Sequence, residues 1–165
     1  MPSQKLCAGL AILLGVLFSG CGHPSIRADF AALSADNGQP LNPSQDNVIK
    51  TARALIGTPY RFGGTTPEGF DCSGFINYVY RNAAGLALPR MAKDLAHSGV
   101  AVRVADLRPA DLVVFKIEWR KPLHVGIYLG QGRFIHAPST GGRVNIQELR
   151  MDYWKDRFLG ARRLI

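Results

Sequence analysis

The chain has 165 residues, enough for one ordinary domain and too few to expect two. Twenty lysines and arginines against twelve aspartates and glutamates give a formal net charge of +8, which favours anionic partners such as lipid head groups or a carboxylate-rich polymer. The basic residues form no run of the kind found in nucleic-acid-binding arms, so we expect no nucleic-acid partner; a solvated basic face explains the charge equally well.

Residues 1–20 are typical of a secretory signal peptide. Lys5 precedes an uncharged apolar run from Leu6 to Phe18, and two small residues, Ser19 and Gly20, follow it. A charged start, an apolar stretch of about 7–15 residues and a small-residue exit describe an export signal, whereas a membrane-spanning helix needs about 20 apolar residues. We therefore expect an exported protein.

The segment around Cys21 resembles a bacterial lipoprotein signal. In that signal the cysteine is lipidated and becomes the new N-terminus, although Phe18 stands here where leucine is usual. Gly22, rather than aspartate, follows the cysteine, and this resembles the default sorting of Gram-negative lipoproteins to the outer membrane. The resemblance implies a lipid anchor on Cys21 at the periplasmic face of that membrane. Ordinary secretory cleavage that leaves Cys21 free is the alternative.

Residues 21–44 are polar and small, with three prolines and no sustained period, so we expect a flexible tether before a domain of residues 45–165. Three helices are expected at the start of the domain. Ser44 is predicted to cap the first, which ends at Gly57. The second begins near Asp71 or Cys72 and runs to about Ala84, and a short third helix covers 93–97.

Beyond residue 110 the apolar period becomes strand-like. Helices followed by a meander of neighbouring strands predict an α+β domain with an antiparallel sheet. The expected strands are residues 111–117, 123–129, 133–137, 143–147 and 158–164.

Cys72 is the only thiol that would remain in the mature chain, because Cys7 leaves with the signal and lipid consumes Cys21. Exported proteins usually keep their cysteines as disulfides, so a solitary thiol there suggests chemistry. Cys72 shares one helix face with Phe75, Ile76 and Val79, and we expect this face to pack on the sheet. At the first turn of a helix, free N–H groups and the macrodipole favour a thiolate. Asp71 is expected to cap this helix.

Two histidines are expected to lie near this thiol. A hairpin centred on Gly130 would place His124 directly opposite His136, on the face that also holds Gly126 and Tyr128. If the Cys72 helix covers that face, the sulfur and the two imidazoles form a line. Such a line suits a nucleophile, a base and a group that orients the base. Tyr60 is a candidate hydroxyl donor to an oxyanion, with simple packing as the alternative.

Two other interpretations of these residues stay open. Cys, His and His are also a plausible three-ligand zinc site, although the chain has no short ligand pair of the C-x-x-C or H-E-x-x-H type. A cell-wall binding module that keeps the groove without turnover is the second alternative.

Several motifs, in order over residues 45–165, resemble the NlpC family of cell-wall cysteine peptidases. The resemblance implies a papain-like α+β fold with the nucleophile at a helix start. It assigns the nucleophile to Cys72, the catalytic histidine to His124, the third polar residue to His136 and an oxyanion-site tyrosine to Tyr60. The motifs are GTPYRFGG, GFDCSGFINYVY, LPR, LRPADLVVF, HVGIYLGQGRFIHAPSTGGRV and YW.

The same resemblance implies hydrolysis of amide bonds in peptidoglycan stem peptides or their cross-links, with no metal or other cofactor. Amide transfer needs only a different acyl acceptor and remains an alternative. No sequence feature indicates a regulatory protein partner. Two departures from the family pattern stand out: Ala110 replaces a usual glycine, and Met91 replaces a small hydroxyl residue at a position expected to line the groove.

Overall fold

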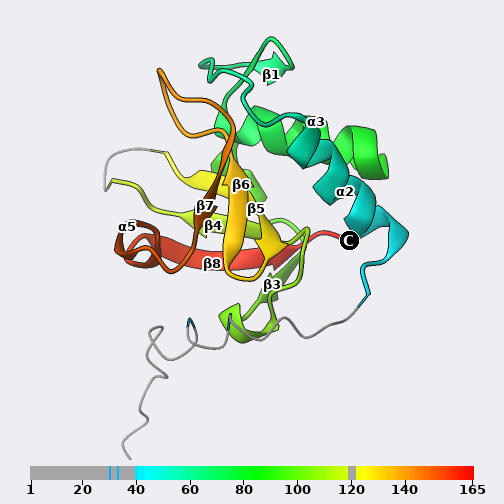
Figure 1. Cartoon of the computed structure of the whole chain (residues 1–165), viewed down its shortest axis with the longest axis vertical. Coiled ribbons are helices and arrows are strands. Elements are labelled where there is room, and N and C mark those ends of the chain that lie inside the picture. The colour runs from blue at the N-terminus through cyan, green and yellow to red at the C-terminus, as the bar shows by residue number, and fades with distance from the viewer. Residues whose placement is uncertain (1–29, 31–32, 34–39, 119–121) are drawn as a thin grey trace, which may run out of the picture.

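The computed structural model describes residues 30, 33, 40–118 and 122–165 (Figure 1). The predicted signal peptide of residues 1–20 and the predicted lipidation site at Cys21 lie outside these residues. The helical elements are α2 (Pro43–Ala54), α3 (Cys72–Ala84), α4 (Ala92–Leu95), the 3-10 turn η2 (Val104–Asp106) and α5 (Asp152–Lys155). The strands are β1 (Thr65–Thr66), β2 (Gly69–Phe70), β3 (Val100–Val102), β4 (Leu112–Phe115), β5 (His124–Gly130), β6 (Arg133–His136), β7 (Asn145–Glu148) and β8 (Phe158–Arg163).

Six strands form one antiparallel sheet in the order β3-β8-β4-β5-β6-β7, and β1 pairs with β2 in a separate ribbon. Strands β4 to β7 are consecutive neighbours, as the predicted meander requires. The last strand, β8, returns to pair with β4. The expectation of an α+β domain with an antiparallel sheet is confirmed.

Helices α2 and α3 lie beside each other over one side of the sheet (Figure 1). The apolar face of α3 is fully buried there, with Phe75, Ile76 and Val79 packed in one cluster with Val125 and Ile127 of β5. A second cluster is built on the alternate residues of the same strands, including Tyr128, Phe134 and Trp154 of α5. Because side chains alternate along a strand, this cluster occupies the other face of the sheet.

The second predicted helix is confirmed at both ends. Asp71 is its N-cap, and its side chain accepts a hydrogen bond from the Gly74 N–H. Gly85 ends the helix with φ 64°, a left-handed conformation that glycine adopts without steric cost. The first helix begins earlier than predicted, because Asn42 rather than Ser44 is its cap. Asn42 and Gln45 form a reciprocal capping box, which satisfies two otherwise free N–H groups.

Ala110, which replaces the glycine usual in the resembled family, adopts φ 72° in the turn before β4. A left-handed conformation disfavours any side chain with a Cβ, which explains why glycine suits this turn. The turn is nevertheless tied down, since the Ala110 N–H donates to Tyr128 O and the Ala110 carbonyl accepts from the Tyr80 hydroxyl.

Two residues within the predicted tether pack on the domain. Phe30 and Leu33 are 3% and 5% exposed and belong to the second cluster. Phe30 meets Phe158 of β8 edge to face, with 5.5 Å between ring centroids. The predicted tether of residues 21–44 therefore includes two residues that are buried against the domain. Its residues 21–29, 31–32 and 34–39 lie outside the described part of the chain.

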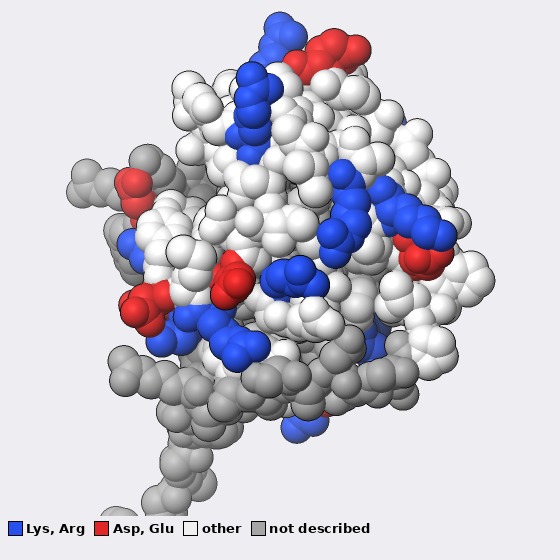
Figure 2. All heavy atoms as spheres, viewed as in Figure 1, with Lys and Arg blue, Asp and Glu red and all other residues white. Residues whose placement is uncertain are grey.

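Lysine and arginine side chains occur in several separate groups on the face drawn in Figure 2, with aspartate or glutamate beside some of them. In the described part of the chain, no helix combines the length and apolarity needed to cross a bilayer.

Candidate active site

The sulfur of Cys72 lies at the start of α3, next to the beginning of β5. Cys72 is the first residue of the helix and, within the described residues, the one free cysteine. Its sulfur accepts a hydrogen bond from the backbone N–H of Val125, the residue that follows His124. The structure thus places the thiol beside the backbone of the strand that carries the predicted base.

The expected packing of α3 over the His124 face of the sheet is wrong. The helix covers the opposite face, where Val125 and Ile127 point, while His124 points toward the second cluster. The reason is that Phe75, Ile76 and Val79 need the apolar side of β5, which is the one that alternates with His124. Cys72 reaches the histidine strand because it stands at the tip of α3, where β5 begins.

His124 and His136 are joined directly, with 2.7 Å between Nε2 of His124 and Nδ1 of His136. They are not the directly opposed pair that the sequence predicts. In the β5–β6 ladder Ile127 pairs with Ile135 and Tyr128 with Phe134, so the register differs by two residues from a hairpin centred on Gly130. A shift of two keeps both rings on the same face, and such diagonal neighbours remain within reach of each other.

Aromatic rings enclose this histidine pair. Trp154 stacks near His124, with ring centroids 5.8 Å apart and an interplanar angle of 28°, and meets His136 edge to face. His124 and His136 are 6% and 1% exposed. Burial lowers the pKa of His124 to about 4. Burial, followed by the charge of His124, lowers the pKa of His136 to about 3, while the nearby Asn145 side chain acts in the opposite sense. Both rings are therefore neutral at neutral pH.

Tyr60 lies in the loop before β1 and is held on both sides by backbone contacts. Its N–H donates to Gly142 O, and Tyr60 bridges to Phe70 of β2. Partial burial raises the pKa of the Tyr60 hydroxyl, and the charges of the Cys72 thiolate form and of Asp71 raise it further. The influence of Cys72 places this hydroxyl in the electrostatic neighbourhood of the sulfur.

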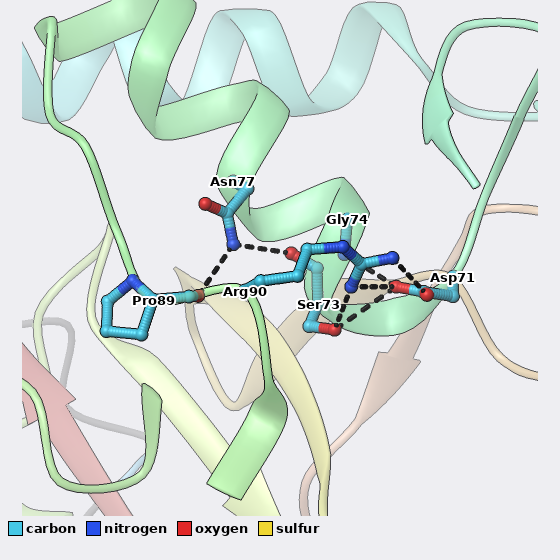
Figure 3. Close-up of polar contacts among 6 residues, drawn as sticks. All are labelled: Asp71, Ser73, Gly74, Asn77, Pro89 and Arg90. Carbon is cyan, nitrogen blue, oxygen red and sulfur yellow. Dashed lines mark hydrogen bonds and ion pairs between the residues drawn. The ribbon is translucent and has the colours of Figure 1, made fainter. Parts of the chain in front are cut away.

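A polar network surrounds the start of α3 (Figure 3). Arg90 holds the Asp71 carboxylate with two hydrogen bonds, of 2.6 and 3.1 Å, and donates a third, of 2.8 Å, to the Ser73 hydroxyl. The Asn77 amide fixes the segment that carries Arg90, because it donates both to Ser73 O and to Pro89 O. Figure 3 shows the guanidinium facing the Asp71 carboxylate directly, with the Ser73 hydroxyl beside both groups.

Burial and neighbouring polar groups determine the pKa of the Cys72 thiol. Burial raises the pKa of Cys72 and the neighbouring Asp71 carboxylate raises it further, whereas the backbone N–H of Val125 lowers it. Burial also disfavours the charged form of Asp71, but hydrogen bonds from Arg90 and Gly74 hold the pKa of that carboxyl below its usual value. Asp71 is therefore an anion next to the thiol, and Arg90 is the cation that balances it.

We predict that Arg90→Gln makes the Cys72 thiol less reactive. Without the guanidinium, no cation balances the Asp71 anion, which disfavours the thiolate. Alkylation by iodoacetamide at pH 7.5 should therefore slow roughly three- to tenfold. Adding Asp71→Asn should restore much of the rate, because it removes the charge that Arg90 balances. Arg81→Gln serves as a matched control because Arg81 lies on the helix that carries Cys72. The thiol of this variant should be alkylated at the wild-type rate. Equal rates in wild type and Arg90→Gln would contradict the prediction.

Across the residues that the structure describes, no group of three His, Cys, Asp or Glu side chains is arranged to hold a metal ion.

Comparison with known proteins shows the family of this chain. The model of the NlpC/P60 family matches residues 57–163, which span the Cys72 helix and the whole histidine hairpin. The chain belongs to the NlpC/P60 family.

Its relatives include cell-wall enzymes. The chain is 36% identical to the murein DD-endopeptidase/murein LD-carboxypeptidase MepS of Escherichia coli over 94% of its own length and 90% of that protein. It is 46% identical to the probable endopeptidase YafL of the same species over 81% of its length. Among solved structures, an NlpC/P60 protein from Bacillus cereus superposes with a TM-score of 0.69 at 34% identity, covering 74% of this chain and 41% of that one. The chain spans between 28% and 54% of the length of three curated relatives that it matches.

Sequence reasoning missed Trp154 and Arg90 as parts of the site. Both belong to motifs that support the family resemblance, YW and LPR, but neither has a role that its neighbours in the chain reveal. Their positions depend on tertiary contacts, since Arg90 meets a carboxylate 19 residues away and Trp154 meets a ring 30 residues away. Met91 is exposed and is the N-cap residue of α4, without a side-chain cap hydrogen bond.

Proposed function

We propose that this protein is a cysteine peptidase that hydrolyses amide bonds in peptidoglycan peptides, either in stem peptides or in their cross-links. The observation that carries the proposal is the buried hydrogen bond between His124 and His136, on a strand whose backbone also contacts the sulfur of Cys72. The names of the relatives, murein endopeptidases among them, support the substrate class.

In the proposed mechanism Cys72 is the nucleophile, His124 the base and later the acid, and His136 the orienting group. The Nε2 of His124 faces Nδ1 of His136, which leaves Nδ1 of His124 to take the thiol proton. For this, His136 must accept from Nε2–H of His124 through its own Nδ1. In that tautomer the proton of His136 is on Nε2, a buried atom that has no hydrogen-bond partner among the described residues.

Because the pKa of Cys72 is raised and that of His124 is lowered, we propose that the resting site holds a neutral thiol beside a neutral imidazole. The proton then moves as the sulfur attacks the amide carbonyl. The proposed donors to the oxyanion that forms are the Cys72 N–H at the start of α3 and the Tyr60 hydroxyl. Water afterwards hydrolyses the acyl-enzyme, with His124 activating it.

The proposed substrate determines the test. Purified mature protein is incubated with muropeptides, and mass spectrometry identifies the products. New amine and carboxyl ends support a hydrolase and identify the bond that is cut. Retention of muropeptides without new ends would indicate a binding module instead. Inhibition by chelators together with one bound zinc per chain would indicate the metal alternative, and products joined to an added amine would indicate amide transfer.

We further propose that the protein is a lipoprotein anchored through Cys21 at the periplasmic face of the outer membrane. Support comes from the apolar run of residues 6–18 and from the small residues that precede Cys21. Cells that produce the protein should incorporate radiolabelled palmitate into it, and Cys21→Ser should abolish the label. Labelling that persists in Cys21→Ser would overturn the anchor.

A further inference from the structure

Two residues that precede the family match belong to the second cluster. The NlpC/P60 model matches residues 57–163, whereas Phe30 and Leu33 come well before its start. Both side chains are buried among residues of β4, β8 and the neighbouring strands. The His124 ring points toward this same cluster. A segment outside the family match therefore packs into the part of the core that surrounds the proposed base.

A row of rings runs across the sheet from Phe30 to His124. Phe115 of β4 pairs directly with His124 of β5 on one side and with Phe158 of β8 on the other, and these three strands are neighbours (Figure 1). The centroid of the Phe115 ring lies 6.3 Å from that of His124 and 6.0 Å from that of Phe158. Phe30 extends the row, since its ring meets Phe158 edge to face at 5.5 Å. The rings of Phe158 and Phe115 alone separate Phe30 from the proposed base.

Close packing makes the position of each ring depend on its neighbour. Protein interiors are packed as densely as organic crystals, so a ring that loses its neighbour shifts toward the gap. Without Phe30, Phe158 would lose an edge-to-face contact, and the fully buried Phe115 would in turn lose part of its support. His124 packs against Phe115 while its Nε2 lies 2.7 Å from Nδ1 of His136. A shift of Phe115 would therefore move the His124 ring.

The proposed mechanism tolerates little movement of this ring. One nitrogen of His124 has to keep its partner on His136, and the other has to reach the sulfur of Cys72. A displacement of about 1 Å that originates far from the reacting atoms can lower a rate about 10²-fold. We expect a smaller displacement from a contact that lies two rings away, and hence a loss of about tenfold.

We propose that Phe30 is a positioning residue: packed against β8, it fixes the row of rings that holds His124 in its catalytic orientation. The inference rests on the proposed function, in which His124 is the base. It makes full activity of the domain depend on a segment that precedes the family match. Because Phe30 acts through Phe158 and Phe115, its removal should slow the chemical step and leave substrate binding unchanged.

Steady-state cleavage of muropeptides by the full mature chain tests this role. Phe30→Ala should lower kcat about tenfold and keep KM within about twofold of the wild-type value. Phe30→Leu fills part of the volume of the ring, so its kcat should fall only about two- to fourfold. Ile49→Ala is the matched control, because Ile49 of α2 is 9% exposed and belongs to the cluster on the α3 side of the sheet. It should lower the melting temperature about as much as Phe30→Ala does, yet keep the wild-type kcat.

The outcomes separate this role from general destabilisation and from the proposed function. An equal kcat in wild type and Phe30→Ala would overturn the inference while the hydrolase stands. An equal fall of kcat in Ile49→Ala would also overturn it, because reduced stability alone would then explain the effect. If circular dichroism shows that Phe30→Ala is unfolded, Phe30→Leu decides: a two- to fourfold lower kcat at constant KM supports the role, and an unchanged kcat overturns it. If wild type cleaves no muropeptide, the proposed function fails and the inference fails with it.

Discussion

Replacing Cys72 by alanine is expected to lower kcat/KM for muropeptide cleavage by at least about 10³-fold, because no other group in the proposed site can form the covalent acyl intermediate. The substitution removes one sulfur from a position that is only partly buried, so the fold should survive. Mass spectrometry of the products over time, with circular dichroism as the check on folding, measures the effect.

Binding separates this result from a damaged groove. Cys72→Ala should still retain muropeptides in a pull-down, since the thiol is required for turnover and not for most substrate contacts. Cleavage at an unchanged rate in Cys72→Ala would remove the thiol mechanism.

His124→Gln is expected to lower kcat/KM by about 10³-fold, within the range that positioned acid–base groups contribute. Glutamine keeps a polar side chain of similar length but cannot take the thiol proton or return it to the leaving amine. His97→Gln provides the control, because His97 is exposed in the turn after α4 and its ring bonds the Lys93 carbonyl of that helix. A loss of less than about tenfold in His124→Gln would be incompatible with its role as base.

The wild-type pH profile adds a second criterion for the same residue. The base works only when neutral, and burial lowers the pKa of His124 to about 4. Activity should therefore persist below pH 6 and fall only as the pH approaches about 4. An unperturbed histidine would lose activity through about pH 6.5, so an acid limb at that value would show that His124 is not the base. His136→Gln should retain partial activity, because the base remains and loses only its orienting partner.

Much of the fold could be predicted because local patterns agree with the tertiary structure. The face of Phe75, Ile76 and Val79 has a helical period, and Asp71 and Gly85 mark the ends of that helix, so α3 follows from adjacent residues alone. The alternation along β5 assigns His124 and Val125 to opposite faces in the same way. Short elements such as β3, of three residues, and α5, of four, carry too little periodicity to predict.

The hairpin register shows why part of the site escaped prediction. The predicted hairpin is centred on Gly130, but the turn consists of Gln131 and Gly132, which both adopt positive φ, as a two-residue turn of type I′ requires. A bulge between Tyr128 and Gly130 then shifts the ladder again. Neither choice can be read from the residue types. The histidines still meet, because the total shift is even and keeps both rings on one face.

The sheet face that receives α3 was the other error, and it has an energetic reason. Burying three large apolar side chains stabilises the fold more than burying one thiol does. The helix therefore packs Phe75, Ile76 and Val79 against the apolar side of β5. Cys72 then has access to the histidine strand only from the helix tip. Arg90 escaped notice for a related reason, because its ion pair with Asp71 joins residues 19 positions apart in the sequence.

Burial of Phe30 limits how far an anchored enzyme could operate from its membrane. Nine residue steps separate Cys21 from Phe30, against twenty-one from Cys21 to the Asn42 cap of α2. A fully extended chain covers at most about 3.3–3.6 Å per residue. The greatest distance between Cys21 and the domain is therefore about 30 Å when Phe30 is bound, instead of about 70 Å. With a lipid on Cys21, the catalytic domain would reach only the layer of murein nearest the bilayer. Peptides deeper in the wall would lie beyond its reach.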